Sequence, residues 1–238
     1  MNIALLGYGK MGKAIEKIAL DREHTITLKV GRQDTYTLND VSIDVAIDFS
    51  IPEVATSHIS QCLSAHIPVV SGTTGWLSDY QHIVDTCQKE KGAFLYASNF
   101  SVGVNVFFEI NQRLAQLLAP YKEYQTHIEE IHHTQKLDAP SGTAITLAEG
   151  IIEQGIYKDW TLINESTSIK DNSIPIQSKR VGTVPGTHII THHSSIDDIS
   201  LKHEAHSREG FALGAVIAAE WIIGKKGVFS MRDVLNIS

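Results

Sequence analysis

The chain has 238 residues, of which 42% are hydrophobic and 20% charged, and its formal net charge is −7. These proportions exclude the disordered and fibrous classes, and the acidic balance, without a dense run of Lys and Arg, argues against a nucleic-acid partner. The first apolar run stops at Gly7, too early for a signal-peptide core or a membrane span, and two cysteines build no disulfide framework, so we expect a cytoplasmic protein with no membrane partner.

The first hundred residues alternate short β-branched runs with helical patterns, which is typical of βαβ units. We expect strands at 2–6, 25–30, 43–49, 67–71 and 93–97, and helices near 10–20, 52–64 and 78–91. This order predicts a Rossmann-type, doubly wound parallel sheet.

After Asn99 the pattern changes to that of a second, α+β architecture. Helices are expected near 104–118 and after Ser141, and strands at Gln125–His132 and near 160–165, 187–193 and 198–204, before a last apolar helix at Phe211–Gly224. The sequence therefore predicts an α/β protein with a dinucleotide-binding domain of residues 1–101 plus 209–238. A substrate and oligomerisation domain of residues 102–208 is inserted before the C-terminal helix, and two short crossings predict hinge closure.

Gly7-Tyr8-Gly9-Lys10-Met11-Gly12 is a GxGxxG that follows a predicted strand and opens a predicted helix. In a dinucleotide site one glycine makes the tight turn, one lets the backbone approach the pyrophosphate, and one lets helix and strand pack closely. An isolated motif of this kind is as often a plain βα turn, but its place after the first strand favours a dinucleotide.

The end of the second strand reads Val30-Gly31-Arg32, without the carboxylate that NAD-preferring proteins often place there. Arg32 is suited to a 2′-phosphate, so we expect NADPH to be accepted at least as well as NADH. The alternative is a solvated surface arginine.

Small residues follow the next two buried strands, as Gly72-Thr73-Thr74 and as Ala97-Ser98-Asn99-Phe100. Doubly wound folds bind ligands at the carboxyl ends of their strands. Each segment alone is compatible with an ordinary turn, but together they predict the nicotinamide pocket.

The segment from Glu130 to Ala144 joins a general-acid candidate, a cation and a helix N-terminus. Ser141 is a plausible N-cap, and the first N–H groups of the helix, at Gly142 and Thr143, suit a carboxylate, with Lys136 as the opposing charge. Adjacent histidines on a strand point to opposite faces, so His132 and His133 alone are a poor metal chelate, and we expect no metal. The His192-His193 pair has no such neighbours, and we interpret it as structural or surface.

The segment resembles the E-x-H-H-x-x-K-x-D-x-P-S-G-T-A signature of dihydrodipicolinate reductases. The similarity extends to six further segments, so that it covers essentially the whole chain. They are Asp48–Ser50, Gly72–Gly75, Asn99–Gly103, Arg180–Gly182, Pro185–His188 and Ser207–Ala215. Two departures are a glycine loop one residue shorter than in many members, and Gly31 where some members carry an acid.

The resemblance implies an NADPH- or NADH-dependent reduction of 4-hydroxy-tetrahydrodipicolinate, through dihydrodipicolinate, to tetrahydrodipicolinate in the diaminopimelate route to lysine. It also implies His132 as the general acid and Lys136 as a second acid or an electrostatic stabiliser. His133, Lys136, Ser141, Gly142 and Thr143 would bind a small cyclic dicarboxylate. The family is commonly a homotetramer formed through the second domain's sheet.

Three other interpretations compete with this one. Another Rossmann oxidoreductase, such as an amino-acid or sugar dehydrogenase, would share the glycine loop but does not need His-His-x-x-Lys followed by Ser-Gly-Thr. A non-catalytic redox sensor would bind NADPH without oxidising it, and a metal-dependent hydrolase would need zinc-ligand spacings that the histidines do not have.

Overall fold

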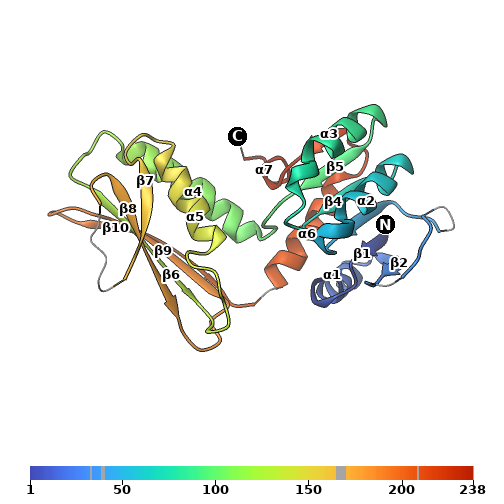
Figure 1. Ribbon diagram of the computed structural model, residues 1–238, viewed down its shortest axis with the longest axis horizontal. Coiled ribbons are helices and arrows are strands. Elements are labelled where there is room, and N and C mark those ends of the chain that lie inside the picture. Colours follow the sequence, from blue (N-terminus) through green and yellow to red (C-terminus); the bar gives the residue numbers. More distant parts are fainter. Residues whose placement is uncertain (33, 39–40, 165–169, 208, 238) are drawn as a thin grey trace. The chain divides into compact units, whose positions relative to one another are not determined.

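The structure is a computed structural model that describes residues 1–32, 34–38, 41–164, 170–207 and 209–237. The chain divides into two compact units (Figure 1). Unit 1 combines Met1–Asn105 with Glu209–Ser238, and unit 2 is the intervening Val106–Arg208.

Unit 1 is built on a six-stranded sheet in the order β11-β5-β4-β3-β1-β2, in which every pairing is parallel. Its strands are β1 (Asn2–Leu6), β2 (Thr25–Val30), β3 (Val45–Asp48), β4 (Val69–Ser71), β5 (Ala93–Tyr96) and β11 (Gly227–Phe229). Chain order reverses at β1, which has β2 on one side and β3 on the other. Ligands of doubly wound folds bind at such a switch point, outside the carboxyl ends of the strands.

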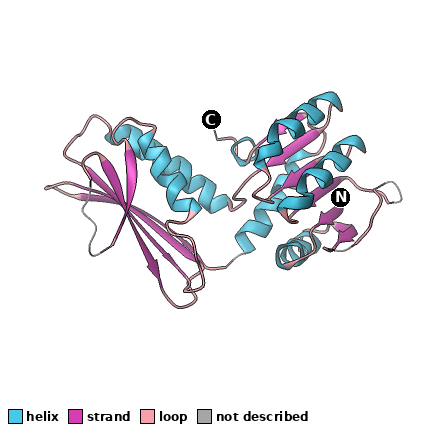
Figure 2. Ribbon diagram, viewed as in Figure 1, coloured by secondary structure: helices cyan, strands magenta, loops and turns pink. Residues whose placement is uncertain are grey.

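Helices cover both faces of this sheet (Figure 2). One apolar core joins the sheet to α1 (Lys10–Asp21), α6 (Glu209–Ile222) and the short α7 (Met231–Val234), and a second joins it to α2 (Pro52–Ser64) and α3 (Tyr80–Lys89). A 3₁₀ turn at Leu77–Asp79 precedes α3. The predicted Rossmann-type architecture is confirmed, and so is the C-terminal helix that covers the sheet of the first domain.

Unit 2 has a five-stranded mixed sheet in the order β10-β9-β6-β8-β7. Its elements are α4 (Val102–Leu118), which begins in unit 1, β6 (Gln125–His132), α5 (Gly142–Ile152), β7 (Asp159–Ile163), β8 (Ser173–Arg180), β9 (Gly186–His193) and β10 (Asp198–Ala205). Strand β6 is central, parallel to β8 and antiparallel to β9. Helices α4 and α5 pack on one face through residues such as Phe107, Leu147 and Ile176.

Three elements were not predicted: β8, β11 and α7. Pro175 made residues 173–180 a poor strand candidate, because proline cannot donate to a strand ladder. In the structure Pro175 pairs only with Thr161 of β7, and the pairing of β8 with β6 begins one residue later, at Ile176. The strand expected near 160–165 ends at Ile163, and residue 165 lies outside the described residues.

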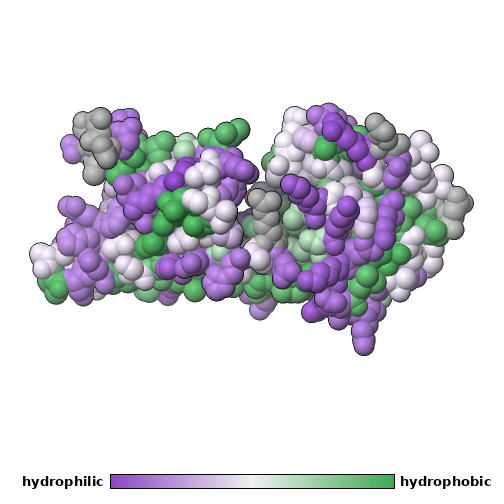
Figure 3. Space-filling model, turned by 90° about the horizontal axis from the view of Figure 1, so that it is seen from below, coloured by the Kyte–Doolittle hydropathy of each residue, from purple (hydrophilic) through white to green (hydrophobic). Residues whose placement is uncertain are grey.

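Hydrophilic side chains are spread over the face of the two units seen in Figure 3, with hydrophobic areas between them. Among the helices that the structure describes, none is long and apolar enough to cross a lipid bilayer.

Candidate active site

The carboxyl ends of the parallel strands form one row in unit 1. Strand register places Leu6 beside Asp48, Asp48 beside Ser71, and Ser71 beside Tyr96. The segments predicted to bind a dinucleotide follow these residues directly, so the sheet brings the glycine loop, Gly72–Thr74 and Ala97–Phe100 to a single edge.

The three glycines of the loop differ in what surrounds them. Gly7 has a φ of +97°, and an added Cβ would lie 2.2 Å from the carbonyl oxygen of Phe49. A Cβ on Gly12 would lie 2.6 Å from the carbonyl oxygen of Gly7, whereas one on Gly9 would meet nothing within 4 Å. Gly7 thus makes the tight turn, Gly12 allows the close contact of the helix, and Gly9 leaves the backbone open to a pyrophosphate, which are the three features of a dinucleotide-binding loop.

Helix α1 begins at Lys10 without a side-chain cap and without an acidic residue in its first turn. Its first N–H groups and its dipole therefore favour an anion. The side chain of Tyr8 already has partners within unit 1. Its hydroxyl donates to the carboxylate of Glu16, and the ammonium of Lys29 lies 5.1 Å from the centroid of its ring.

The turn after β2 contains a carboxylate that the sequence analysis missed. The backbone N–H of Gly31 donates to Oδ2 of Asp34 over 2.6 Å, so this acid folds back to the end of the strand. Arg32 is exposed beside it. The end of β2 thus carries both an acid and a base, although the strand itself ends without an acid.

Asp48, which is fully buried at the end of β3, ties the neighbouring strand ends together. It accepts hydrogen bonds from Ser50 at 2.7 Å, Ser71 at 2.9 Å and Thr73 at 2.7 Å. Nδ1 of His58 lies 3.2 Å from the same carboxylate. The hydroxyl of Thr73 is therefore used inside the protein, where it helps to hold the ends of the strands together. Thr74, next to it, is exposed.

The segment after β5 is divided in the same way. Phe100 is buried and packs on Phe49 with ring centroids 5.5 Å apart, so its side chain belongs to the core. Asn99 accepts from the N–H of Ser101 at the start of α4 over 2.9 Å. Ser98 is the exposed member of the segment, while Ala97 and Asn99 are partly buried.

In unit 2, the residues predicted to be catalytic gather at the carboxyl end of β6. His132 is the last residue of this strand and is 8% exposed. Its Nδ1 lies 3.1 Å from Oε2 of the fully buried Glu130, two residues earlier on the same face of the strand. A Cβ added to Gly186 of β9 would lie 3.1 Å from Nε2, so the glycine leaves space on that side of the imidazole.

The loop after β6 carries Lys136. Its ammonium contacts both carboxylate oxygens of Asp138, at 2.8 and 2.7 Å. The guanidinium of Arg180 at the end of β8 donates to the carbonyls of Lys136, at 3.3 Å, and Asp138, at 2.6 Å. The same group reaches Oε1 of Glu130 at 3.1 Å, so Arg180 connects the loop to the buried acid.

Ser141 is the N-cap of α5, as the sequence predicts: its Oγ accepts from the N–H of Ala144. That oxygen also lies 3.1 Å from Nε2 of His188, a residue without a predicted role. With its side chain used in this way, Ser141 offers little to a ligand. Gly142 is exposed, and a Cβ there would meet nothing within 4 Å, so an anion can approach the first N–H groups of the helix.

Two of these buried groups have strongly shifted pKa values. Burial alone would raise the pKa of Glu130, but the neighbouring groups of His132, Ser141 and Ser178 outweigh it and hold that pKa well below its ordinary range. Burial, with a smaller contribution from the charge of His132, lowers the pKa of His188 to about 4. At neutral pH this site therefore holds the carboxylate of Glu130 beside a neutral His188.

Glu130, His132 and His188 each present one ligand atom within 4.8 Å of the others, which is the spacing of a metal site. The opposite oxygen of Glu130 already faces the guanidinium of Arg180. A carboxylate that binds an arginine on one side and an imidazole on the other has less charge left for a cation, so we interpret this cluster as a hydrogen-bonding network.

Glu130, Arg180 and His188 were not assigned a role from the sequence. A signal existed for Glu130, because a carboxylate two positions before a histidine on a strand shares its face. Arg180 and His188 belong to two segments of the family resemblance, Arg180–Gly182 and Pro185–His188, but that resemblance gave them no role. They reach the site through the register of β8 and β9.

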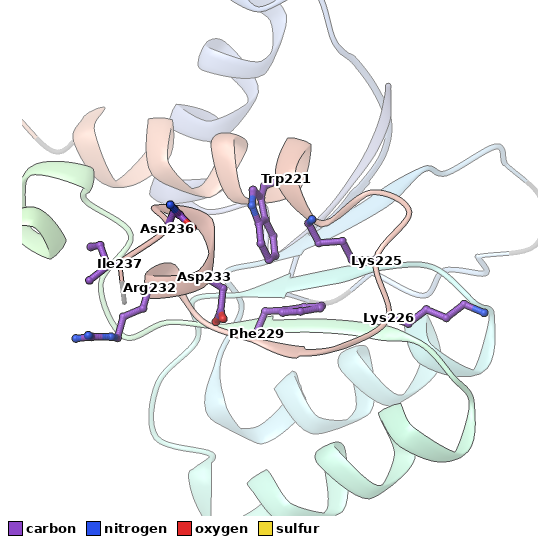
Figure 4. A pocket seen from close by; sticks show the side chains of 8 residues that line it. All are labelled: Trp221, Lys225, Lys226, Phe229, Arg232, Asp233, Asn236 and Ile237. Atoms are coloured by element: carbon purple, nitrogen blue, oxygen red, sulfur yellow. The ribbon is translucent and has the colours of Figure 1, made fainter.

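Unit 1 also has a cavity of about 470 Å³ beside α6 and α7, and its lining includes none of the predicted site residues (Figure 4). Trp221 and Phe229 face one another there with ring centroids 5.1 Å apart. Lys226 and Arg232 also line it but point outward in different directions. A ligand site needs converging polar groups, and this cavity does not present them.

Comparisons with known proteins show the family to which the chain belongs. The family model "Dihydrodipicolinate reductase, N-terminus" matches residues 1–100, and "Dihydrodipicolinate reductase, C-terminus" matches residues 103–235. The 4-hydroxy-tetrahydrodipicolinate reductase of Christiangramia forsetii is 55% identical over 238 residues, covering 99% of this chain and 98% of that protein. The reductase of the same name from Methanosarcina acetivorans is 34% identical over 241 residues, covering 99% and 89%.

Among solved structures, a dipicolinate-bound dihydrodipicolinate reductase from Paenisporosarcina sp. TG-14 has a TM-score of 0.79 at 24% identity, covering 98% of each chain. This match shows that the two proteins share a fold. The chain belongs to the dihydrodipicolinate reductase family and is an oxidoreductase that uses NADH or NADPH.

Proposed function

We propose that this protein reduces 4-hydroxy-tetrahydrodipicolinate, through dihydrodipicolinate, to tetrahydrodipicolinate in the diaminopimelate route to lysine. The observation that carries the proposal is the grouping at the end of β6: an imidazole held by a buried acid, an ammonium on the next loop, and an accessible helix N-terminus. The relatives named above support the choice of substrate.

Unit 1 is the proposed cofactor-binding part. Its glycine loop fits a pyrophosphate, because Gly9 is open and the first turn of α1 is uncapped. A dinucleotide held by this loop would supply a hydride to C4 of the unsaturated imine that forms when the substrate loses water. Thr74 and Ser98, which are exposed, and the small, partly buried Ala97 leave space for the nicotinamide at the row of strand ends.

Unit 2 is the proposed substrate-binding part. The N–H groups of Gly142 and Thr143 bind one carboxylate of the substrate, and His133 with Lys136 binds the other. After hydride transfer the ring is an enamine, and its ring carbon accepts a proton from His132 to give the cyclic imine product. Lys136 stabilises the negative charge that develops during this step.

The second sheet also supports the proposal that the protein is a tetramer formed through unit 2. Helices α4 and α5 cover one face of this sheet, and the other face holds a shallow cavity of about 390 Å³ lined by residues such as His127, Ile163 and Pro175. A second copy of the chain would cover this face. We propose that the enzyme is cytoplasmic, as the sequence analysis expects.

The experiment that tests the function follows NADPH oxidation at 340 nm with the freshly generated condensation product of pyruvate and aspartate semialdehyde. Oxidation that requires this product supports the proposal. NADPH binding without oxidation would instead support a redox sensor.

A further inference from the structure

We propose that Glu130 is the positioning residue of the active site: it fixes the ring of His132 directly and, through Arg180, the loop that carries Lys136. The inference rests on the proposed function for its kinetic consequences, whereas its structural consequence holds without turnover.

The register of the sheet creates this arrangement. In the central strand β6, Glu130 lies opposite His188 of β9, and His132 lies opposite Arg180 of β8. Glu130 is fully buried, so its charge needs partners inside the protein. The strands on either side of β6 supply them.

The two carboxylate oxygens of Glu130 have separate partners. Oε1 accepts from Arg180 over 3.1 Å, and Oε2 lies 3.1 Å from Nδ1 of His132. The two atoms are close but not aligned as a hydrogen bond: within the described part of the chain, neither Oε2 nor this Nδ1 has a hydrogen-bond partner. Nε2 of His188 also faces Oε2, at 3.9 Å. A rotation of the imidazole that aligns the two atoms would make this contact a hydrogen bond, with Nδ1–H as donor.

This contact decides which ring nitrogen acts. A proton held on Nδ1 by a carboxylate leaves Nε2 as the nitrogen that exchanges protons with a ligand. Nε2 points toward Gly186, where an added Cβ would lie only 3.1 Å away. The absence of a side chain at Gly186 therefore keeps space on the reactive side of the ring.

Arg180 extends the effect to Lys136. Besides Glu130, its guanidinium donates to the backbone carbonyls of Lys136 and Asp138. One buried carboxylate thus sets the position of the imidazole on one side and, through one guanidinium, of the Lys136 loop on the other. Lysine in place of Arg180 keeps the charge but lacks the planar fork that makes these bonds together.

The first test is spectroscopic and does not depend on catalysis. In protein labelled with ¹⁵N-histidine, the nitrogen shifts of the neutral ring report which nitrogen carries the proton, and loss of signals in His132→Gln assigns them. We expect neutral His132 to be protonated on Nδ1 in the unmodified protein and to move toward the Nε2–H form in Glu130→Gln. An unchanged tautomer in Glu130→Gln would overturn the proposal.

The second test separates kcat from KM. We expect Glu130→Gln to lower kcat at least about tenfold, while the Kd for NADPH stays unchanged because the cofactor site lies in unit 1. Glu130→Asp, which keeps the charge, should recover part of this loss. Glu149→Gln, an exposed carboxylate on α5, is the matched control and should behave as the unmodified protein.

Arg180→Lys tests whether Arg180 connects Glu130 to the Lys136 loop. It also tests the proposal if Glu130→Gln fails to fold. We expect a raised KM for the substrate and a lower kcat, with the Nδ1–H tautomer retained. Unchanged kinetics in folded Arg180→Lys would remove the link to Lys136. If the unmodified protein oxidises no NADPH with the substrate but shows the expected tautomer change, the proposed function fails and the positioning of His132 stands.

Discussion

The ammonium of Lys136 lies 2.7 Å from Oδ2 of Asp138, so the cation predicted to bind the substrate is neutralised by its own loop. The lysine side chain is 20% exposed and the aspartate 61%. A substrate carboxylate that binds the ammonium of Lys136 must therefore displace the carboxylate of Asp138 or share the ammonium with it.

Replacing Lys136 by alanine should impair both binding and chemistry. We expect the KM of Lys136→Ala for the substrate to rise at least about tenfold and kcat to fall as well, because one ammonium pairs with a substrate carboxylate and stabilises developing charge. Steady-state kinetics measures both constants. Lys122→Ala, at an exposed position of the same unit, is the control; a KM as low as that of the control would exclude Lys136 from substrate binding.

In the glycine loop between β1 and α1, alanine substitutions at Gly9 and Gly12 should affect cofactor affinity and stability differently. Gly9→Ala places its methyl group where nothing lies within 4 Å, so we expect an unchanged Tm and an NADPH Kd raised at least about tenfold, since the pyrophosphate meets the new side chain. Gly12→Ala drives its methyl group to 2.6 Å from the backbone of Gly7 and should lower Tm. Calorimetry and fluorescence titration measure the two quantities. Equal NADPH affinity in Gly9→Ala would show that the cofactor binds elsewhere.

We predict that cofactor preference depends on the turn after β2, where Arg32 and Asp34 have opposite charges. We expect NADPH to be used at least as well as NADH, and Arg32→Ala to raise the KM for NADPH several-fold more than that for NADH, because only NADPH carries the 2′-phosphate. Asp34→Asn should shift the preference toward NADPH. A clear preference of the unmodified protein for NADH, unaffected by Arg32→Ala, would contradict this assignment.

Acid should destabilise the fold before its carboxylates titrate. Burial lowers the pKa values of His188 and His192 from 6.5 to about 4. A histidine whose pKa is lower in the folded chain binds a proton more readily in the unfolded chain. The contribution of these two histidines to the free energy of unfolding is therefore fully present above about pH 6.5, and it is lost as the pH drops from about 6.5 to 4. Each contributes on the order of 3 kcal/mol over that window.

Urea unfolding at pH 7.5, 6 and 5, at fixed protein concentration, measures this effect. The unfolding midpoint should fall with pH, and His192→Gln should show a shallower dependence than the unmodified protein. Glu130 acts in a separate range: its lowered pKa adds stability above about pH 4.5 that is lost only in stronger acid. An unfolding free energy that stays constant between pH 7.5 and 5 would contradict the prediction.

Local patterns were sufficient for much of the fold. Alternation over Gln125–His132 gave β6 with its observed bounds, and Ser141 was identified as the cap of α5 because a serine before an apolar helical run suits that role. The glycine loop likewise needed only its neighbours in sequence. These features depend on residues within a few positions of one another.

The remaining features depend on contacts distant in sequence. Arg180 reaches Glu130 across 50 positions, and Ser141 meets His188 across 47. The family resemblance marks the segments that contain Arg180 and His188, but only the pairing of β6 with β8 and β9 shows which groups these side chains contact. The turn that returns Asp34 to Gly31 was missed for a different reason, since the acid was sought at the strand end itself.

The most direct test of the account is NADPH oxidation at 340 nm with freshly generated condensation product, measured in parallel for the unmodified protein and His132→Gln. We predict substrate-dependent oxidation that falls roughly a hundredfold or more in His132→Gln, with circular dichroism and NADPH affinity unchanged. Equal turnover by the two proteins would remove His132 from the mechanism, and no oxidation by the unmodified protein would contradict the proposed function.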